Sequence, residues 1–541
     1  MNSPDNPRLN LIELAHLRFE NSYVRELPGD PLLHNTPRQV SNACYTRVTP
    51  TAVKSPQLLA WSDSVGELLG IRRPDAVTGL AADVFGGNRV LPGMQPYAAR
   101  YGGHQFGHWA GQLGDGRAIS LSEVMAGKQR YELQLKGAGR TPYSRTADGR
   151  AVLRSSVREF LCSEAMHAMG VPTTRALSLV ATGEAVVRDM FYDGNPEAEP
   201  GAIVCRVAPS FIRFGHFEIL AAHKELDTLK KLADYVILHH FAELGAPSQD
   251  VYGLWFHEIC RRTAVMVAEW MRVGFVHGVM NTDNMSILGL TIDYGPYGWL
   301  EGYDLNWTPN TTDAEGRRYA YGNQPEIALW NLSCLAGALA PLFEDHDALH
   351  AGFDLFRRTY KETSGQHFAA KLGVSQLEGD DDERLLAELL ALLQAVETDM
   401  SIFFRQLAGV PTEATADALD DWTLTLALHP ALYSTESLGT NYLRQLAGWV
   451  RRYIVRLRTD GMTSSERQTR MNLVNPKYVL RNYLAQEAID ALTAGDASAV
   501  NRLLKVLQQP YAEQPEHEAL AARRPEWVRH KAGYSALSCS S

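Results

Sequence analysis

The chain has 541 residues, which is too long for one compact core and suggests roughly two to four structural units. Its composition, 45% hydrophobic and 21% charged, is that of an ordinary globular protein, and its net charge of −10 argues against a general nucleic-acid binder. The sequence contains no run of about 18 apolar residues, so we expect no transmembrane helix. Six cysteines lie scattered with no Cys-x-x-Cys pair, and the N-terminus lacks the order of a signal peptide, so we expect a cytoplasmic protein.

The first part of the chain is predicted to be a mixed lead-in. Residues 1–95 contain several proline-rich turns, and we expect short helices at 11–19 and 55–69. A glycine-dense segment follows at 96–118 and includes Tyr101-Gly-Gly-His-Gln-Phe-Gly-His-Trp-Ala-Gly-Gln-Leu-Gly-Asp-Gly-Arg117. This density of glycine predicts turns and loops.

Strands and one helix are expected next. Residues 118–123 and 130–136 alternate between apolar and polar side chains as strands do. Helical periodicity over 154–166 begins with serines suited to capping. Residues 174–188 and 201–206 return to strand character, with a turn-rich excursion between them.

The second half of the chain has mainly helical periodicity. Long apolar-striped helices are expected over 226–244 and 251–273, and another begins at 323–332. Residues 385–396 are a strong helix candidate, and the four acidic residues just before them favour a helix N-terminus.

A strand-rich half followed by a helix-rich half predicts an α+β fold. We expect a two-lobed, protein-kinase-like nucleotide-binding core at 96–345. An N-terminal extension, 1–95, would pack on this core, and 346–541 would form a mainly helical C-terminal region.

The stretch from His277 to Gly295 carries the strongest chemical signal. In protein kinases, an Asn of the catalytic loop and the Asp of Asp-Phe-Gly hold the metal ions. Asn284 and Asp293 (of Asp-Tyr-Gly) can take these roles with Mg²⁺ or Mn²⁺. The base that kinases carry five residues before that Asn is replaced by Val279, which cannot accept a proton. The alternative interpretation is an Asx-type turn that binds no metal.

Candidate phosphate-binding groups lie in the glycine-dense segment. Gly111, Gly114 and Gly116 can bring backbone N–H groups against phosphate because no Cβ intervenes. Arg117 directly behind them adds a fixed charge. The alternative is that these are only turn glycines.

Lys136 ends an expected strand, and Glu159 lies on the expected helix that follows. A strand lysine held by a helix glutamate and facing phosphate is the ion pair that kinase folds use. The alternative is a surface pair that stabilises by only ~0–1 kcal/mol. Asp148 and Gly149, between the lysine and the helix, can contact nucleotide or form a plain turn.

Arg206 and Arg213 stand in an apolar, aromatic segment. Buried arginines are unfavourable unless they are paired, and phosphate is a suitable partner. The histidines His104, His108, His216 and His277 form no metal-spaced set, so we interpret them as structural.

With these residues assembled, the chain resembles the selenoprotein-O family, also called the YdiU family. The resemblance rests on long segments that cover nearly the whole chain: the glycine-dense segment 101–117, Leu133-Gln-Leu-Lys-Gly-Ala-Gly-Arg-Thr-Pro-Tyr-Ser-Arg145, and residues 148–161, 206–210, 213–218, 277–286, 293–296 and 475–482.

The resemblance implies a pseudokinase fold that binds ATP in a reversed orientation and transfers AMP to hydroxyl side chains of proteins. It also implies possible use of UTP with Mn²⁺. The nucleotide-binding residues it implies are Gly114, Gly116, Arg117, Lys136, Asp148, Gly149, Arg206, Arg213 and Asp293. Glu159 would support Lys136, Asn284 and Asp293 would bind the metal, and Asp283 would be the catalytic proton acceptor in place of the base missing at Val279.

One departure concerns redox control. Some members of this family bridge a cysteine near the C-terminus to one in the loop after Asp-Tyr-Gly. Here Cys539 is present, but residues 295–324 contain no cysteine. That bridge is therefore not expected.

We predict a protein adenylyltransferase that transfers AMP from ATP to Ser, Thr or Tyr hydroxyls with release of pyrophosphate, with UMP transfer from UTP as a further activity. The expected partners are protein substrates, including the chain itself, with no nucleic acid and no membrane, and we expect a monomer. A conventional kinase and a non-catalytic nucleotide-binding scaffold are the alternatives. The sequence does not distinguish ATP from UTP, or Mg²⁺ from Mn²⁺.

Overall fold

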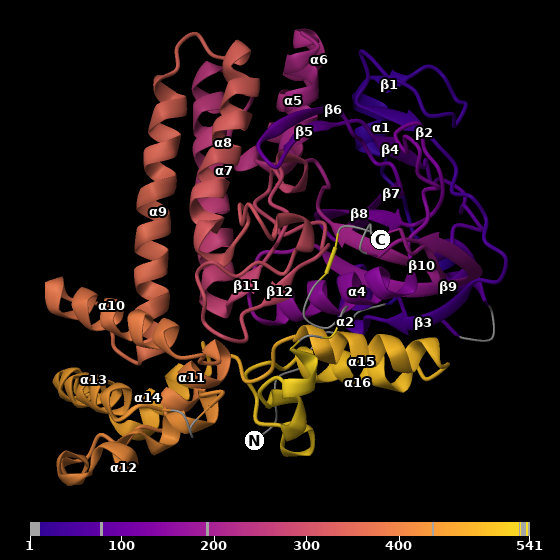
Figure 1. Cartoon of the computed structure of the whole chain (residues 1–541). Helices are drawn as coiled ribbons and strands as arrows, with labels where there is room; N and C mark the ends of the chain where they lie inside the picture. The colour runs from indigo at the N-terminus through magenta and orange to yellow at the C-terminus, as the bar shows by residue number, and fades with distance from the viewer. Residues whose placement is uncertain are drawn as a thin grey trace, which may run out of the picture.

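The computed structural model describes residues 11–75, 79–190, 194–434, 438–529, 531 and 537–538. The protein is a mixed α/β structure in which a large sheet lies beside many helices (Figure 1). No helix in the described ranges combines the length and the apolar character that a membrane span requires.

The main sheet has eight strands. In spatial order they are β1 (Gly29–Asp30), β2 (Tyr45–Arg47), β4 (Tyr97–Ala99), β7 (Ala118–Ala126), β8 (Gln129–Lys136), β10 (Glu197–Ala208), β9 (Arg175–Arg188) and β3 (Gln57–Trp61). Strands β1 and β2 pair in parallel, and the other neighbours are antiparallel. Two short hairpin-like pairs lie outside it: β5 (Gly102–Gln105) with β6 (His108–Gln112), and β11 (Phe275–Val276) with β12 (Gly298–Trp299).

The helices fall mainly in the second half of the chain. They are α1 (Ser22–Glu26), α2 (Asp63–Leu68), α3 (Leu80–Phe85), α4 (Leu153–Ala168), α5 (Phe214–Ala222), α6 (Leu226–His240), α7 (Gln249–Val273), α8 (Gln324–Leu339), α9 (Asp347–Leu372), α10 (Gly379–Ala395), α11 (Met400–Leu407), α12 (Asp421–Thr425), α13 (Thr440–Thr459), α14 (Ser464–Asn472), α15 (Asn482–Thr493) and α16 (Ser498–Leu507).

The predicted central strands and long helices are confirmed. The 118–123 and 130–136 segments are β7 and β8, joined by a turn in which Gly127 has φ +62°. Helix α7 starts at the Ser248 cap, whose side chain accepts from the Val251 N–H, and ends at Gly274 with φ +74°. Three acidic residues fill the first turn of α10, where the helix dipole favours negative charge.

The predictions for the lead-in were partly wrong. Residues 11–19 contain only a short 3₁₀ turn, Leu14–His16, and 55–69 form strand β3 followed by α2 instead of one helix. Strand β3 pairs with β9 along the edge of the sheet, so tertiary pairing overrides the local pattern. Residues before 96 thus supply three strands of the main sheet.

The predicted serine cap of α4 is also wrong. The helix begins at Leu153, with Val152 as its cap and no capping side chain. Ser155 and Ser156 therefore fall inside the first turn, where they donate to the carbonyls of Val152 and Ala202 at 3.1 and 3.3 Å.

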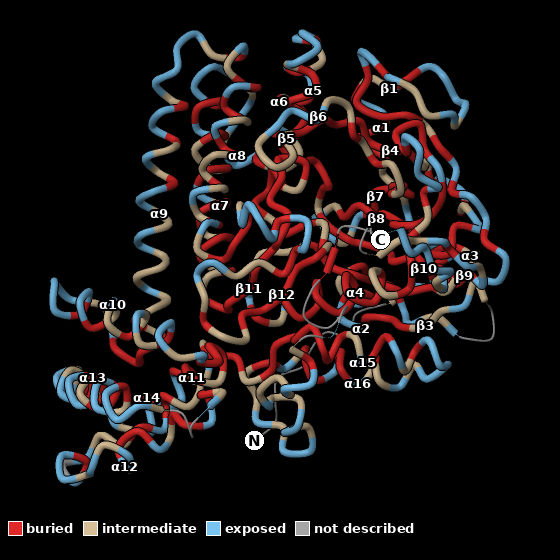
Figure 2. The backbone as a smooth tube through the Cα atoms, in the orientation of Figure 1, coloured by how far each residue is buried: buried red, intermediate tan, exposed pale blue. Residues whose placement is uncertain are grey.

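Two groups of helices lie beside the sheet (Figure 1). Helices α7, α8 and α9 run side by side as one group, and the C-terminal helices α15 and α16 lie against α4 (Figure 1). Buried residues are concentrated in the sheet, in α4 and in the segments between them and α7, while α10, α12 and α13 carry many exposed residues (Figure 2).

The C-terminal part of the chain also reaches the loop that follows Asp293-Tyr-Gly. Leu537 forms a parallel bridge with Asn310, and its N–H donates to the Pro309 carbonyl at 3.1 Å. Backbone hydrogen bonds thus hold this segment to the loop. Cys539 lies outside the described residues.

Candidate active site

Lys136 and Glu159 form a buried ion pair between the main sheet and α4. Lys136 is the last residue of β8 and Glu159 lies on α4, so the strand and the helix that packs on the sheet bring them together. The Lys136 Nζ is 2.6 Å from Glu159 Oε2, and both side chains are buried. The surface-pair alternative is therefore excluded. Burial lowers the pKa of Lys136 from its ordinary value, and the charge of Glu159 opposes that shift.

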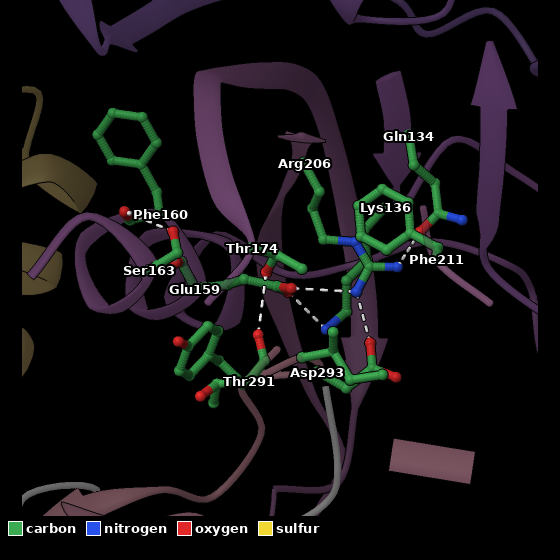
Figure 3. A network of polar contacts seen from close by, with 12 residues as sticks. Gln134, Lys136, Glu159, Phe160, Ser163, Thr174, Arg206, Phe211, Thr291 and Asp293 are labelled. Carbon is green, nitrogen blue, oxygen red and sulfur yellow. Dashed lines mark hydrogen bonds and ion pairs between the residues drawn. The ribbon is translucent and has the colours of Figure 1, made fainter. Parts of the chain in front are cut away.

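Arg206 on β10 links this pair to Asp293. Its Nη1 lies 3.1 Å from Glu159 Oε1 and 2.5 Å from Asp293 Oδ1, and its other Nη donates to Gln134 (Figure 3). The guanidinium also stacks over the Phe211 ring at 5.1 Å. One arginine therefore holds two carboxylates from different parts of the chain in fixed positions.

A second arginine completes the surroundings of Asp293. The Nη1 of Arg213 contacts Asp293 Oδ2 and donates to the Asp283 carbonyl at 2.8 Å. Burial opposes ionisation of Asp293, but the charges of Arg213, Arg206 and Lys136 hold its pKa well below the ordinary value. Asp293 has φ +56°, a left-handed conformation that is unusual outside glycine.

Asp283 has a contrasting environment ten residues earlier in the chain. It lies in the 3₁₀ turn Thr282–Asn284 and is buried. Its Oδ2 accepts from Gln105 Nε2 at 3.1 Å, whereas its Oδ1 has no hydrogen-bond partner within the described residues. Burial raises the pKa of Asp283 to about 7, with a smaller upward contribution from Asp293.

Asn284 and Val279 are joined by one hydrogen bond. Asn284 Nδ2 donates to the Val279 carbonyl at 2.9 Å, which fixes the amide orientation and turns Oδ1 away from that bond. Val279 is buried, and its apolar side chain cannot accept a proton at the position where kinases carry the base. The His277 Nε2–H donates to the Ile292 carbonyl at 2.9 Å, and the ring is buried, as expected for a structural histidine.

The first part of the glycine-dense segment packs directly on this turn. The His104 N–H donates to Thr282 Oγ1 at 2.7 Å, and the next residue, Gln105, reaches Asp283. A Cβ at Gly103 would lie 2.8 Å from Asp283 Oδ1, so only glycine allows this approach. The β5–β6 hairpin therefore forms one wall around Asp283. The sequence analysis did not identify Gln105 and Gly103 as site residues. The one signal for them in the sequence is that both lie in the glycine-dense segment 96–118.

Gly114 and Gly116 have a packing role in this structure. Gly114 has φ +75°, and a Cβ there would meet the Tyr143 ring at 2.4 Å. A Cβ at Gly116 would lie 2.9 Å from the Tyr143 carbonyl. The turn-glycine alternative accounts for both residues, and their backbone contact with phosphate stays a prediction. Arg117 is half-buried, and burial lowers its pKa against the raising effect of Glu159 and Asp293.

Asp148 and Gly149 lie outside the Lys136 network. Asp148 forms a two-pronged ion pair with Arg188 of β9, with N–O distances of 2.6 and 2.8 Å, and is partly exposed. Gly149 has φ +74°, and a Cβ there would collide with Gly139 at 2.2 Å. These contacts fit a structural turn at least as well as a nucleotide contact.

The described residues offer suitable ligands for a divalent metal ion. Asp283, Asn284 and Asp293 provide carboxylate and amide oxygens, the donor type that Mg²⁺ and Mn²⁺ prefer. Asp283 Oδ1 is buried and finds no hydrogen-bond partner in the described part of the chain, and the arginines keep Asp293 ionised. The residues therefore fit a metal ion, provided that Arg206 and Arg213 turn partly from Asp293 toward another anion.

A network that joins a strand lysine, a helix glutamate and an acidic turn defines a class of nucleotide-binding transferases. Comparison with known families narrows this class: residues 33–508 match the family model described as "Protein adenylyltransferase SelO". The chain belongs to this family and is an enzyme of the nucleotidyltransferase type.

Full-length relatives support the same assignment. The chain is 63% identical over 555 residues to a protein from Nitrosospira multiformis, which covers 99% of this chain and 98% of the relative. It is 57% identical to a protein from an Azoarcus species over 97% of this chain and 99% of the relative. A Xanthomonas campestris protein is 56% identical over 98% and 100%. All three are named "Protein nucleotidyltransferase YdiU".

Proposed function

We propose that the protein transfers AMP from ATP to Ser, Thr or Tyr hydroxyls of proteins and releases pyrophosphate, with UMP transfer from UTP as a second activity of the same site. The observation that carries this proposal is the charge arrangement around Asp293. Lys136, Arg206 and Arg213 converge there, while Asp283 beside them has a carboxylate oxygen with no hydrogen-bond partner among the residues that the structure describes.

The three cations can serve the phosphate chain. Arginine forks match phosphate oxygens well, and Arg206 and Arg213 are already fixed by Glu159, Gln134 and the Asp283 carbonyl. We propose that they exchange part of their contact with Asp293 for contact with phosphate. Their charges then stabilise the pyrophosphate as it leaves.

Asp283 is the proposed proton acceptor. A substrate hydroxyl oxygen attacks the α-phosphorus, the bond from that phosphorus to the bridging oxygen breaks, and the hydroxyl proton passes to Asp283. Its raised pKa, near neutrality, suits a general base. Gln105 orients the carboxylate through the other oxygen. Asn284 and Asp293 would hold a divalent metal ion, which supplies charge neutralisation at the phosphates when it is bound.

We also propose that the strand-rich and helix-rich parts act as the two lobes of a kinase-like core near 96–345, with 1–95 packed on it and 346–541 as the C-terminal region. The Lys136–Glu159–Arg206 network lies on the sheet and α4, and the Asp283–Asp293 stretch follows the long helix α7. The nucleotide would then lie where these two parts meet.

Labelled ATP distinguishes the proposed reaction from a conventional kinase. We expect label from α-labelled ATP, and none from γ-labelled ATP, to reach protein in the presence of Mg²⁺ or Mn²⁺. Intact-mass spectrometry should then find an added AMP, or an added UMP when UTP is supplied. Transfer of the γ-label alone would establish a kinase, and nucleotide binding without any transfer would establish a scaffold.

A pair of aspartate variants tests the site assignment in the same assay. Asp293→Ala should abolish transfer because the site loses its ionised metal ligand, whereas Asp345→Ala, an exposed aspartate just before α9, should retain it. Transfer by Asp293→Ala at the wild-type rate would show that the site lies elsewhere.

A further inference from the structure

Three side chains that commonly bind metals meet beside the β5–β6 hairpin. His104 on β5, Glu218 on α5 and Cys334 on α8 each contribute one ligand-type atom, and these atoms lie within 4.8 Å of one another. The His104 Nδ1 is 2.5 Å from Glu218 Oε1. The spacing of histidines in the sequence could not reveal this group, because His104 and Glu218 are 114 residues apart.

Glu218 supplies an independent indication that the group binds a ligand. Its side chain is only 3% exposed, and its Oε2 has no hydrogen-bond partner among the described residues. A buried carboxylate oxygen without a partner is unfavourable, because it has lost its contact with water and gained no hydrogen bond in return. A cation at this position would satisfy it.

The site is open to solvent and yet ordered. The His104 side chain is 29% exposed and Cys334 is half-buried, so an ion and a water molecule can reach them. The ring of His104 packs against Trp109 and Trp330 at centroid distances of 5.2 and 5.6 Å. These indoles restrict the orientation of the imidazole, which favours a preformed ligand set.

We propose that His104, Glu218 and Cys334 bind a Zn²⁺ ion, with water as a fourth ligand. Nitrogen, oxygen and sulfur donors together suit Zn²⁺, whereas Mg²⁺ prefers oxygen alone, so this site differs from the one at Asp293. With bonds of about 2.0–2.3 Å, tetrahedral ligand atoms lie roughly 3.3–3.8 Å apart, so His104 and Glu218 separate by about 1 Å.

Proton and charge balance are consistent with this assignment. On binding, the Cys334 thiol loses its proton to solvent. The ion also displaces the proton between His104 and Glu218, and the imidazole stays neutral by carrying its proton on Nε2, with any excess proton released to solvent. Zn²⁺ with one thiolate and one carboxylate carries no net charge. The nearby Arg318 guanidinium, which stacks on Trp330 at 4.5 Å, is therefore tolerated.

The position of the site gives it a structural effect on the active site. The same His104 donates its backbone N–H to Thr282, and Gln105 holds Asp283. An ion bound to His104, Glu218 and Cys334 ties this hairpin to α5 and α8. A bound ion would therefore fix the wall next to Asp283.

Cadmium titration of the full-length, chelator-treated protein tests the proposal directly. Cd²⁺ binds such ligand sets and produces an ultraviolet thiolate charge-transfer band, which an ion bound only at Asn284 and Asp293 cannot produce. We expect one equivalent of Cd²⁺ to produce the band and to raise Tm, and Zn²⁺ to displace it.

Matched variants assign the ligands. Cys334→Ser and Cys334→Ala should abolish the band and the rise in Tm, and His104→Gln should weaken binding at least about tenfold. His108→Gln, an exposed histidine of the same hairpin, is the control and should bind as the wild type does. Melting without metal checks that each variant is folded. A band that persists in both Cys334 variants, or no band in the wild type, would overturn the proposal.

Discussion

Asp283 and Asp293 are two aspartates of one short stretch with opposite surroundings. Asp293 contacts two arginines and lies near Lys136, and these positive charges hold its pKa well below the ordinary value. Within the described ranges, Asp283 has one side-chain amide donor and one carboxylate oxygen without a partner, and burial raises its pKa to about 7. The neighbouring charges and the burial of each aspartate therefore suit the two carboxylates to different roles. Asp293 is suited to permanent charge and Asp283 to taking up a proton.

The largest expected effect comes from removing the charge of Asp293. Asp293→Asn should lower the free energy of unfolding by about 3–5 kcal/mol, because Arg206 and Arg213 lose their shared carboxylate while remaining buried. Denaturant unfolding without nucleotide measures this change. A loss below about 1 kcal/mol would mean that the arginines do not depend on Asp293.

Asp283→Asn should reduce activity without lowering the free energy of unfolding, unlike Asp293→Asn. AMP transfer should fall by about 100- to 10,000-fold through loss of the base. Its folded-state pKa is raised, so its favourable contribution is present below the unfolded pKa and is lost as pH rises through about 7. At pH 8 without metal, the variant should therefore be at least as stable as the wild type.

Single-turnover transfer and denaturant unfolding give the two measurements for Asp283→Asn. Normal transfer would exclude Asp283 as the base. A loss of stability above about 1 kcal/mol at pH 8 would show that its carboxylate is stabilised by contacts other than those described.

Glu132 provides a further test, because this buried carboxylate forms no ion pair with the described residues. It is buried on β8 and bonded by Ser120, Tyr97 and the Phe211 N–H, and burial raises its pKa to about 7. Because the folded pKa is raised, the wild type should lose up to about 3 kcal/mol relative to Glu132→Gln as pH rises from 4.5 to 7. Paired urea unfolding across this pH range measures the difference. Parallel pH curves would contradict it.

Much of the fold could be predicted from the sequence, because long strands and helices show a clear periodic pattern of apolar residues. Strands β7 and β8 and helix α7 follow from alternation and from apolar stripes. Strand β3 was missed because its pairing partner, β9, lies far along the chain, and no local pattern reports that pairing. The pairing of Lys136 with Glu159 was predicted from motif order and is confirmed by the 2.6 Å contact.

Other features of the site depend on contacts that sequence spacing does not encode. Nothing in the sequence places the Arg213 guanidinium between Asp283 and Asp293, or Gln105 against Asp283. The chemistry of a motif can be read from residue types, whereas the partners that tune each group come from segments brought together by folding.

The helix that carries Glu159 is held by the far end of the chain. Arg158 donates to Asn482 Oδ1 at 3.3 Å across 324 residues, and to the Tyr297 carbonyl at 2.7 Å. During synthesis, Lys136 and Glu159 leave the ribosome long before Asn482 does. A nascent chain that ends before Asn482 therefore lacks this hydrogen bond and the packing of α15 and α16 on α4.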